Sequence, residues 1–142
     1  MIKVKIKKID GDAKIPSYAH GGDAGMDIYS AENLTVKAGE HAKVRTGIAM
    51  EIPDGFVGLV WDKSGISMNY GLKTLGGVID SGYRGEVVIG VVNLSKEDYV
   101  VEKGNKIAQI LIQKVESPEI KEVEELSNSE RGEKGFGSTG VK

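Results

Sequence analysis

The sequence predicts an all-β protein, a sandwich or barrel of short strands, followed by a mobile C-terminal tail. Three features lead to this prediction: short runs rich in valine and isoleucine, turn signals between them, and 20 glycines against 3 prolines in 142 residues. Glycine is favoured where the backbone takes a positive φ, so many glycines between apolar runs indicate many tight turns. Many short strands at regular intervals are typical of a sandwich or barrel, because a single layer cannot bury so many aliphatic side chains.

The first predicted strand lies at the N-terminus, where Ile2, Val4 and Ile6 alternate with lysines. This strict period of two predicts a half-buried strand with a charged outer face. Apolar runs bounded by turn residues predict five more strands, at residues 34–37, 41–52, 55–61, 85–94 and 106–115. Residues 86–94 are nearly all apolar, which is typical of a strand covered on both faces.

Helical patterns are rare in this chain. Residues Ser64–Tyr70 are the best candidate, long enough for about two turns. Residues 116–126 are ambiguous, because Ile120 and Val123 suit helical spacing whereas the following charges suit an extended edge, and we favour a strand. Residues 130–142 are polar and rich in glycine, so they are expected to form a mobile tail after a single domain at 1–129.

Composition restricts the class of protein further. A chain of 142 residues suits one domain, and the lack of cysteine fits a reducing compartment. The formal net charge of -2 provides no basic field for a nucleic-acid backbone. No apolar run has the length of a membrane span, and the N-terminus lacks the apolar block of a secretory signal. We therefore expect a cytoplasmic protein that binds neither nucleic acid nor membranes.

The C-terminal tail carries groups that suit a phosphorylated ligand. Its glycines free backbone N–H groups to form an anion-binding concavity, to which Ser138 and Thr139 add donors. Arg131 offers a planar fork for phosphate oxygens, and Phe136 offers a ring on which a base can stack. The alternative is a solvated, disordered tail, which is common for termini rich in glycine and serine.

A second candidate site lies at residues 72–86, where Asp80 follows Val78 and Ile79 and precedes a Ser-Gly turn. A carboxylate fixed at the end of a buried strand can orient a water molecule and accept its proton. The alternative is that Asp80 only stabilises the turn by bonding its own backbone. Tyr83, taken alone, suits packing better than recognition.

Three further segments carry weaker signals. Lys63, Ser64 and exposed amides at a helix start can cradle a phosphate, although Ser64 can also act simply as an N-cap. Asp27 can be a structural partner for a nearby amide or cation. Gln109 is a polar residue in an apolar strand, so it either bonds to backbone groups or points at a ligand.

Five segments, in this order and at these spacings, resemble the five motifs of the trimeric deoxyuridine triphosphatase (dUTPase) family. They span nearly the whole chain, at Ala24–Ser30, Asp62–Ser67, Gly77–Glu86, Gly104–Ile112 and Arg131–Gly140. The resemblance implies a distorted jelly-roll (β-clip barrel) protomer and a homotrimer with active sites at its subunit interfaces. It also implies hydrolysis of dUTP to dUMP and pyrophosphate, with Mg²⁺ bound mainly by the triphosphate and by water.

The resemblance also implies roles for individual residues. Asp80 would be the base for a water molecule that attacks the α-phosphorus, and Tyr83 would lie beneath the deoxyribose and exclude a 2′-hydroxyl. Asp27 would at most orient metal-bound water, and Thr74 stands where some members have an asparagine near the base. The other implied contacts fall into three groups: the uracil edge with Gly77, Val78 and Ile79; the phosphates with Lys63, Ser64, Gly65 and Gln109; and a lid of Arg131, Phe136, Gly137, Ser138 and Thr139.

Two residues depart from the family pattern. Lys63 replaces a usual arginine, so the charge is kept but bidentate geometry is lost. Lys134 replaces a common glycine, which restricts the backbone of the tail and adds a cation. Two other functions stay open: the related dCTP deaminase, which would need a glutamate as general acid and base, and a regulatory protein that keeps the nucleotide pocket but acts by binding a partner.

Overall fold

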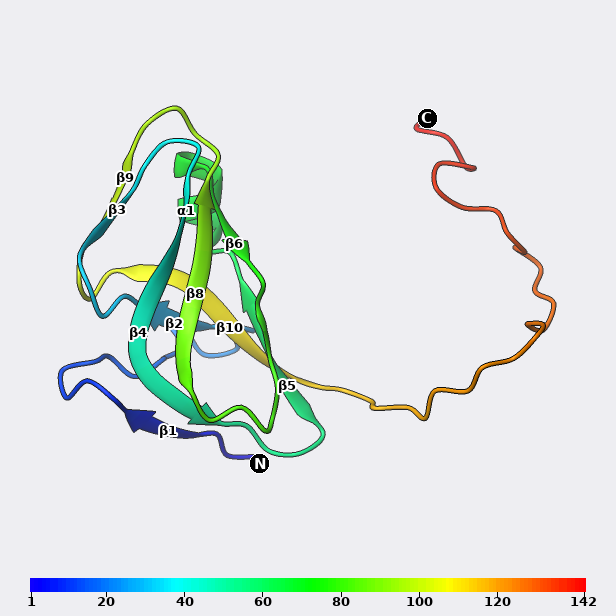
Figure 1. The fold of residues 1–142 in the computed structure, drawn as a ribbon, viewed down its shortest axis with the longest axis horizontal. Helices are drawn as coiled ribbons and strands as arrows, with labels where there is room; N and C mark the ends of the chain where they lie inside the picture. The colour runs from blue at the N-terminus through cyan, green and yellow to red at the C-terminus, as the bar shows by residue number, and fades with distance from the viewer.

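The computed structural model describes residues 1–142 and contains ten strands and one short helix (Figure 1). The strands are β1 Lys5–Lys8, β2 Met26–Tyr29, β3 Leu34–Val36, β4 His41–Glu51, β5 Phe56–Trp61, β6 Leu72–Leu75, β7 Val78–Ile79, β8 Glu86–Asn93, β9 Tyr99–Val101 and β10 Lys106–Lys114. The helix, α1, is Ser64–Tyr70 as predicted, and no helix has the length and apolar character needed to cross a bilayer. The all-β class predicted from the sequence is confirmed.

Two four-stranded antiparallel sheets form the body of the protein. Their strand orders are β1-β4-β8-β6 and β2-β10-β5-β7, while β3 and β9 form a separate pair. The long strands β4 and β8 form the centre of the first sheet, and β10 and β5 form the centre of the second (Figure 1). The sheets do not close into a barrel, and their arrangement is consistent with a jelly-roll-like sandwich.

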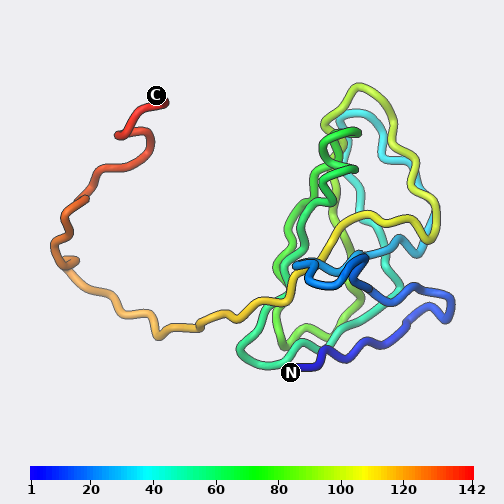
Figure 2. The backbone as a smooth tube through the Cα atoms, turned by 180° about the vertical axis from the view of Figure 1, so that it is seen from behind, coloured from blue at the N-terminus to red at the C-terminus, as the bar shows by residue number.

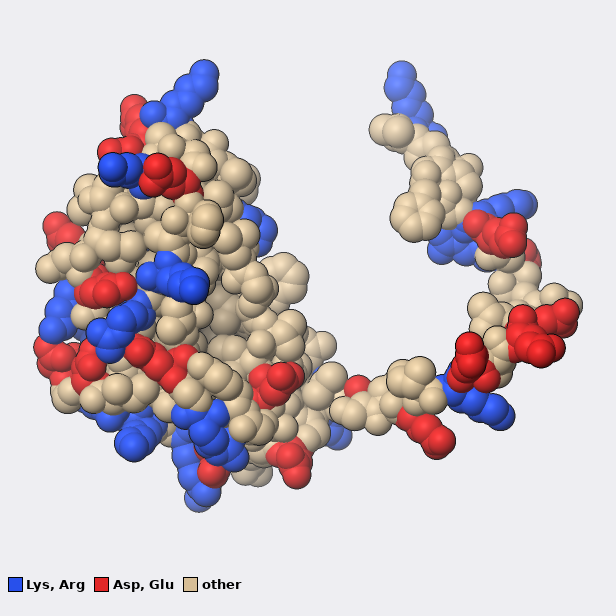
Figure 3. Space-filling view, viewed as in Figure 1, with Lys and Arg blue, Asp and Glu red and all other residues tan.

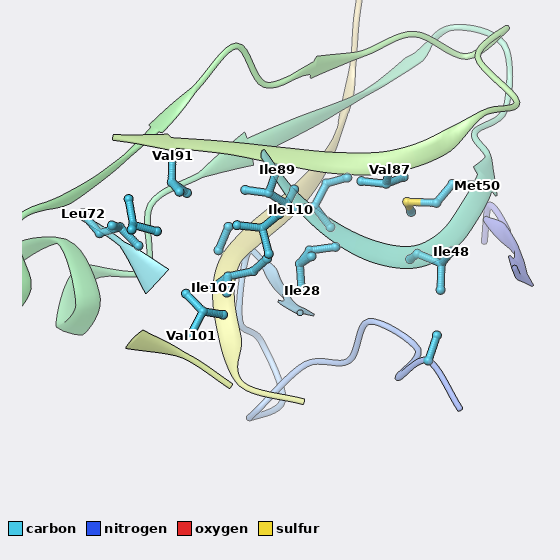
Figure 4. Close-up of a cluster of buried hydrophobic side chains, with 14 of the residues drawn as sticks. Ile28, Ile48, Met50, Leu72, Val87, Ile89, Val91, Val101, Ile107 and Ile110 are labelled. Carbon is cyan, nitrogen blue, oxygen red and sulfur yellow. The ribbon is translucent and has the colours of Figure 1, made fainter. Parts of the chain in front are cut away.

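The core lies between the two sheets and contains a cluster of 15 buried hydrophobic residues. Ile89 of β8 and Ile110 of β10 come from opposite sheets and are almost completely removed from solvent, as is Ile28 of β2. Figure 4 shows these side chains between the ribbons that carry them. Every second residue of β8 faces this core, which is the period expected of a strand.

The outward face of β8 is open in the single chain, which contradicts the prediction that this strand is covered on both faces. Val88 is 44% exposed, whereas its neighbours Val87 and Ile89 are buried. The second sheet covers only one face of β8, so apolar residues on the other face stay at the surface. Figure 3 shows mostly uncharged atoms over β8 and β6, with a Lys or Arg side chain at the level of the middle of β8. A partly apolar face of this kind is typical of a surface that binds another molecule.

Two further expectations need correction at the ends of the chain. Strand β1 is only Lys5–Lys8, because these four residues alone pair with β4, and Ile2 is exposed. Residues 116–126 form no strand, contrary to our preference, because no partner strand lies beside them. The strands β2, β6 and β9 are not evident from the sequence, since runs of three or four residues are too short to display a period of two.

After β10 the chain leaves the body and extends away from it (Figures 1 and 2). The hydrogen bonds of the tail are local, such as the 2.6 Å bond that Arg131 Nε donates to the carbonyl oxygen of Lys134. Acidic side chains gather along the segment that leads to the tail (Figure 3). The tail therefore contributes nothing to the core of its own chain.

Candidate active site

A concave pocket of about 230 Å³ lies beside β7 and the start of β8. Five of the predicted site residues line it: Gly77, Val78, Ile79, Asp80 and Tyr83. Most of the other lining residues are aliphatic. A largely apolar concavity with a few convergent polar groups is typical of a small-molecule site. The structure thus brings together the residues predicted to contact a base and to activate water.

The wall of the pocket is a hairpin built on two glycines. Gly76 and Gly77 have φ values of 69° and 111°, which residues with a side chain rarely adopt. The carbonyl oxygen of Gly77 accepts a 2.8 Å bond from the amide of Val60, and β7 then pairs with β5. Val78 is 68% exposed, so Asp80 does not follow the buried strand that the sequence predicts. Because β7 lies at the edge of its sheet, its outward backbone groups are available to a ligand.

We expect Gly77→Ala to destabilise the fold and to distort the pocket. An alanine Cβ would lie 2.9 Å from the carbonyl oxygen of Val60, at a φ of 111° that is strained for any residue with a side chain. The expected loss of unfolding free energy is about 1–3 kcal/mol, measured by chemical denaturation. Gly82→Ala is the matched control, since a Cβ there meets no atom within 4 Å and its φ is not left-handed. Equal stability of the two variants would contradict this account.

The turn after β7 holds Asp80, an exposed residue that lines the pocket. The backbone closes this turn, since the amide of Tyr83 donates a 3.1 Å bond to the carbonyl oxygen of Asp80. Arg84 braces it with a 2.6 Å bond to the carbonyl oxygen of Ser81. No hydrogen bond or salt bridge within the chain engages the carboxylate of Asp80, although the side chains of Ser81, Tyr83 and Arg84 in the same turn are bonded. This absence argues against a role for the Asp80 side chain in stabilising the turn.

The ring of Tyr83 is held at its hydroxyl and lies close to Gly85. The hydroxyl donates a 2.8 Å bond to the carbonyl oxygen of Glu86. The ring lies against Gly85, where an added Cβ would come within 2.5 Å of the hydroxyl oxygen. A ring held in this way at the pocket wall can exclude part of a ligand by steric contact.

Glu86 also lines the pocket, but the fold itself uses its carboxylate. Oε1 accepts a 3.2 Å bond from Arg45 Nε, and Oε2 accepts a 2.9 Å bond from the amide of Gly47. Arg45 also pairs with Asp10 at 3.1 Å. Both oxygens of Glu86 are therefore engaged, which leaves Asp80 as the unengaged carboxylate of the pocket.

A second group of predicted residues is centred on Asp27, which is buried on β2. Its two oxygens lie 2.6 Å from Lys63 Nζ and 3.1 Å from Lys106 Nζ. Burial raises the pKa of Asp27, but the two ammonium groups outweigh this effect and hold the pKa below its usual range. Sequence reasoning missed Lys106, whose pKa is raised by its bond to Asp27. Because two cations share one carboxylate, this cluster has a net positive charge that suits a phosphate group.

Replacing Asp27 by asparagine is expected to lower stability by about 1–3 kcal/mol at neutral pH. The amide has the same size but leaves Lys63 and Lys106 without their shared countercharge. The pKa of Asp27 is lower in the folded protein than its usual value of 3.8. The carboxylate therefore stabilises the fold fully at pH values above 3.8, and this stabilisation is lost as the pH falls through the folded pKa. The thermal unfolding temperatures of the two proteins should differ at about pH 7 and converge as the pH falls below the folded pKa of Asp27, which itself lies below 3.8. A difference that persists in acid would rule out this ion pairing as its source.

The start of α1 places three predicted phosphate contacts beside this cluster. Lys63 is the N-cap of the helix, and Ser64 and Gly65 are its first two residues. No side chain caps the helix, so the alternative that Ser64 is an N-cap is wrong. Ser64 and Gly65 are exposed, and the first amides of a helix have no partner within it.

Two other predicted contacts, Thr74 and Gln109, bond to Asp62. Thr74 is buried, and its amide and hydroxyl donate bonds of 2.7 Å and 2.9 Å to Asp62 Oδ1. Gln109 Nε2 donates a 2.9 Å bond to the carbonyl oxygen of Asp62. Burial raises the pKa of Asp62, but bonds from Thr74 and Lys73 outweigh it and lower the pKa. The sequence alone assigns Asp62 no role beyond its place in a motif.

The five predicted lid residues lie outside both groups in the single chain. Arg131, Phe136, Gly137, Ser138 and Thr139 are all exposed and bond to nothing outside the tail. No hydrogen bond or salt bridge joins the pocket at Asp80 to the cluster at Asp27. The protomer therefore presents the predicted site as three separate parts.

The residues around Asp27 do not form a direct metal site. Nowhere in the protein do three His, Cys, Asp or Glu side chains gather where they could hold a metal ion. Asp27 is an anion at neutral pH, but a lysine pairs with each of its oxygens. It can therefore reach a metal only through water or after releasing a lysine, which fits an orienting role and not that of a direct ligand.

Comparison with known proteins establishes the family. The dUTPase family model matches residues 11–140. The deoxyuridine 5'-triphosphate nucleotidohydrolase of Clostridium acetobutylicum is 49% identical over 100% of this chain and 99% of its own length. The solved dUTPase of Staphylococcus bacteriophage 80alpha, with dUPNHPP, has a TM-score of 0.93 and 37% identity over 99% of this chain and 100% of that one. A solved mutant dUTPase from phage phi11 of S. aureus has a TM-score of 0.82 and 31% identity over 87% and 98%. The chain therefore belongs to the dUTPase family.

Proposed function

We propose that the protein hydrolyses dUTP to dUMP and pyrophosphate, with Asp80 as the base that activates the attacking water. The observation that carries this proposal is the unengaged carboxylate of Asp80 in a pocket walled by open hairpin backbone and the fixed ring of Tyr83. Family membership and the names of the relatives support the reaction. The reaction would limit uracil incorporation into DNA and supply dUMP for thymidylate synthesis.

The backbone of the hairpin would select uracil. Uracil presents an acceptor–donor–acceptor edge, and the outward amides and carbonyls of Gly77, Val78 and Ile79 offer fixed groups that can match it. Cytosine changes this pattern and would leave buried groups unpaired, a mismatch that can discriminate by about 10⁴-fold. The 5-methyl group of thymine would be excluded by contact, because two consecutive glycines let the hairpin approach the ring closely. Tyr83 would exclude a ribose 2′-hydroxyl in the same way.

The start of α1 would hold the phosphates. Lys63 would exchange its bond to Asp27 for a bond to a phosphate oxygen. The hydroxyl of Ser64 and the amide of Gly65 would donate hydrogen bonds to the phosphates. Gln109 would lie close to the phosphates because it bonds to Asp62. In-line attack at the α-phosphorus depends mainly on positioning and on neutralising charge. Asp80 would take the proton of the attacking water, and the cations would stabilise the departing pyrophosphate.

A homotrimer with shared sites is the assembly that we propose. Three observations support it: the pocket at Asp80 and the cluster at Asp27 are separate within one chain, the apolar face of β8 is open, and the tail extends away from its own body. In this assembly the tail would close over a bound nucleotide, with Phe136 on the uracil and Arg131, Gly137, Ser138 and Thr139 on the phosphates. Residues 130–142 would then act as a lid on the domain at residues 1–129, with residues 116–129 as the extended link between β10 and the lid, and closure would exclude bulk water.

Mg²⁺ is the metal that we propose, bound mainly by the triphosphate and by water. A divalent metal in such a position supplies charge neutralisation on the leaving pyrophosphate. The solved phi11 dUTPase coordinates a structural Mg(II) ion, which supports a divalent metal in the family. Asp27 would orient metal-bound water, because its own oxygens are paired with lysines.

The two rival functions are less well supported. A deaminase would need a glutamate as general acid and base, and the pocket glutamate, Glu86, has both oxygens bonded to Arg45 and the Gly47 amide. A regulatory protein without catalysis would have no need of a free carboxylate at Asp80. Cytoplasmic location, where nucleotide pools are made, is part of the proposal.

Incubation of the purified protein with a panel of nucleoside triphosphates and Mg²⁺ tests this function. We expect pyrophosphate and dUMP from dUTP, and no products from dCTP, dTTP or UTP. Chelation of the metal should suppress turnover, and added Mg²⁺ should restore it. Ammonia released from dCTP would favour the deaminase, and nucleotide binding without any products would favour the regulatory protein.

A further inference from the structure

Asp62, which links β5 to α1, is held at three points. Its Oδ1 accepts bonds from the amide and the hydroxyl of Thr74 at 2.7 Å and 2.9 Å, and its Oδ2 lies 3.0 Å from Lys73 Nζ. Its backbone carbonyl oxygen accepts a 2.9 Å bond from Gln109 Nε2. The partners come from β6 in one sheet and β10 in the other, so Asp62 bonds to both layers of the sandwich.

These bonds satisfy groups that the fold would otherwise leave unpaired. β6 is an edge strand whose other side pairs with β8, so its outward Thr74 amide needs a partner away from the sheet. Thr74 is buried and the Asp62 side chain is 22% exposed, so water competes weakly for these bonds. The bonds are therefore strong enough to restrict movement of the chain at Asp62.

The residues that Asp62 restrains are the next three along the chain, Lys63–Gly65, which we call the phosphate turn. Lys63 is restrained again by its pair with Asp27, and Ser64 and Gly65 begin α1. No other hydrogen bond from the body reaches the side chains of Ser64 or the backbone of Gly65. The turn is therefore held from one side by Asp62 and Lys63, and from the other by α1, whose Ile66 packs against the core.

We propose that Asp62 is a positioning residue. Its bonds to β6 fix the phosphate turn in the position in which the turn binds the phosphates of the substrate. The proposal rests on the proposed function, because it concerns the placement of groups that bind the phosphates of dUTP. Asp62 touches no substrate in this account and acts through Lys63–Gly65. A displacement of such groups by about 1 Å can lower a rate by about 10²-fold.

The test compares Asp62→Ala with Asp62→Asn in the full chain. We expect Asp62→Ala to lower kcat/KM for dUTP by about 10²-fold and to weaken inhibition by pyrophosphate by about tenfold. Inhibition by deoxyuridine, which has no phosphate, should change by less than about twofold, because the hairpin at Gly77–Ile79 is intact. Asp62→Asn keeps an oxygen that accepts both bonds from Thr74, so it should recover kcat/KM to within about fivefold of the wild type.

A matched control and a second variant separate positioning from simple loss of stability. Asp98→Ala also removes a carboxylate that accepts a backbone amide, that of Ala38 at 2.9 Å, but it lies by β3 and β9 and should leave pyrophosphate inhibition unchanged. If Asp62→Ala does not fold, Thr74→Val removes one of the two bonds and should shift pyrophosphate inhibition in the same direction.

Unchanged pyrophosphate inhibition in the folded variant, or equal weakening of inhibition by deoxyuridine, would overturn the proposal. A wild-type protein that leaves dUTP intact would instead refute the function, and the positioning role with it.

Discussion

Asp80→Asn is expected to lower kcat for dUTP by about 10³-fold while a non-hydrolysable dUTP analogue still binds. Asparagine has nearly the same shape as aspartate but cannot accept the proton of the attacking water. The carboxylate of Asp80 makes no bond within the chain, so its replacement removes no contact of the fold. Steady-state turnover and calorimetric binding of the analogue measure the two effects separately.

Asp54→Asn is the matched control for this variant. Asp54 lies beside the same turn, where it accepts a long 3.5 Å bond from Ser81 Oγ, but it does not line the pocket. We expect this variant to keep turnover within about twofold of the wild type, since a weak exposed bond contributes little. Near-normal turnover in Asp80→Asn would refute its role as the base, and loss of analogue binding would show that its charge also shapes the pocket.

Removal of residues 131–142 is expected to lower kcat/KM by about 10²–10³-fold without changing the oligomeric state. The tail supplies Arg131 and the hydroxyls of Ser138 and Thr139 as cation and donors for the phosphates in the proposed lid. It supplies nothing to the body, since its hydrogen bonds are local and Phe136 is fully exposed. Turnover assays and sedimentation of the full and shortened chains give the two measurements.

Removal of Val141 and Lys142 alone is the control for this truncation. These two residues lie beyond Gly140, where the fifth motif ends, so turnover should stay close to that of the full chain. If the longer truncation turned a trimer into monomers, the tail would be a structural element and not a lid. If it left turnover unchanged, the predicted contacts of Arg131, Ser138 and Thr139 would be wrong.

Features that depend on neighbours along the chain could be predicted from the sequence. The alternation of apolar and charged residues and the frequent glycines identify an all-β protein, and Ser64–Tyr70 is correctly placed as a short helix. The segment from Gly77 to Tyr83 forms one pocket wall, because a hairpin keeps residues that are close in sequence close in space. The apolar run of β8 predicts a strand but not its burial, since burial depends on what covers each face.

Contacts between distant segments were decided by the tertiary structure alone. The sequence presents Asp27, Lys63 and Lys106 in three different motifs, and only the pairing of β2 with β10 and the position of α1 bring their charges together. Asp62 and Gln109 are 47 residues apart, and Glu86 meets Arg45 41 residues away. Charges interact through space, so the state of a carboxylate depends on which cations the fold places within a few ångströms of it. Local sequence therefore determined which groups are available, and the packing of the two sheets determined which remain free to react.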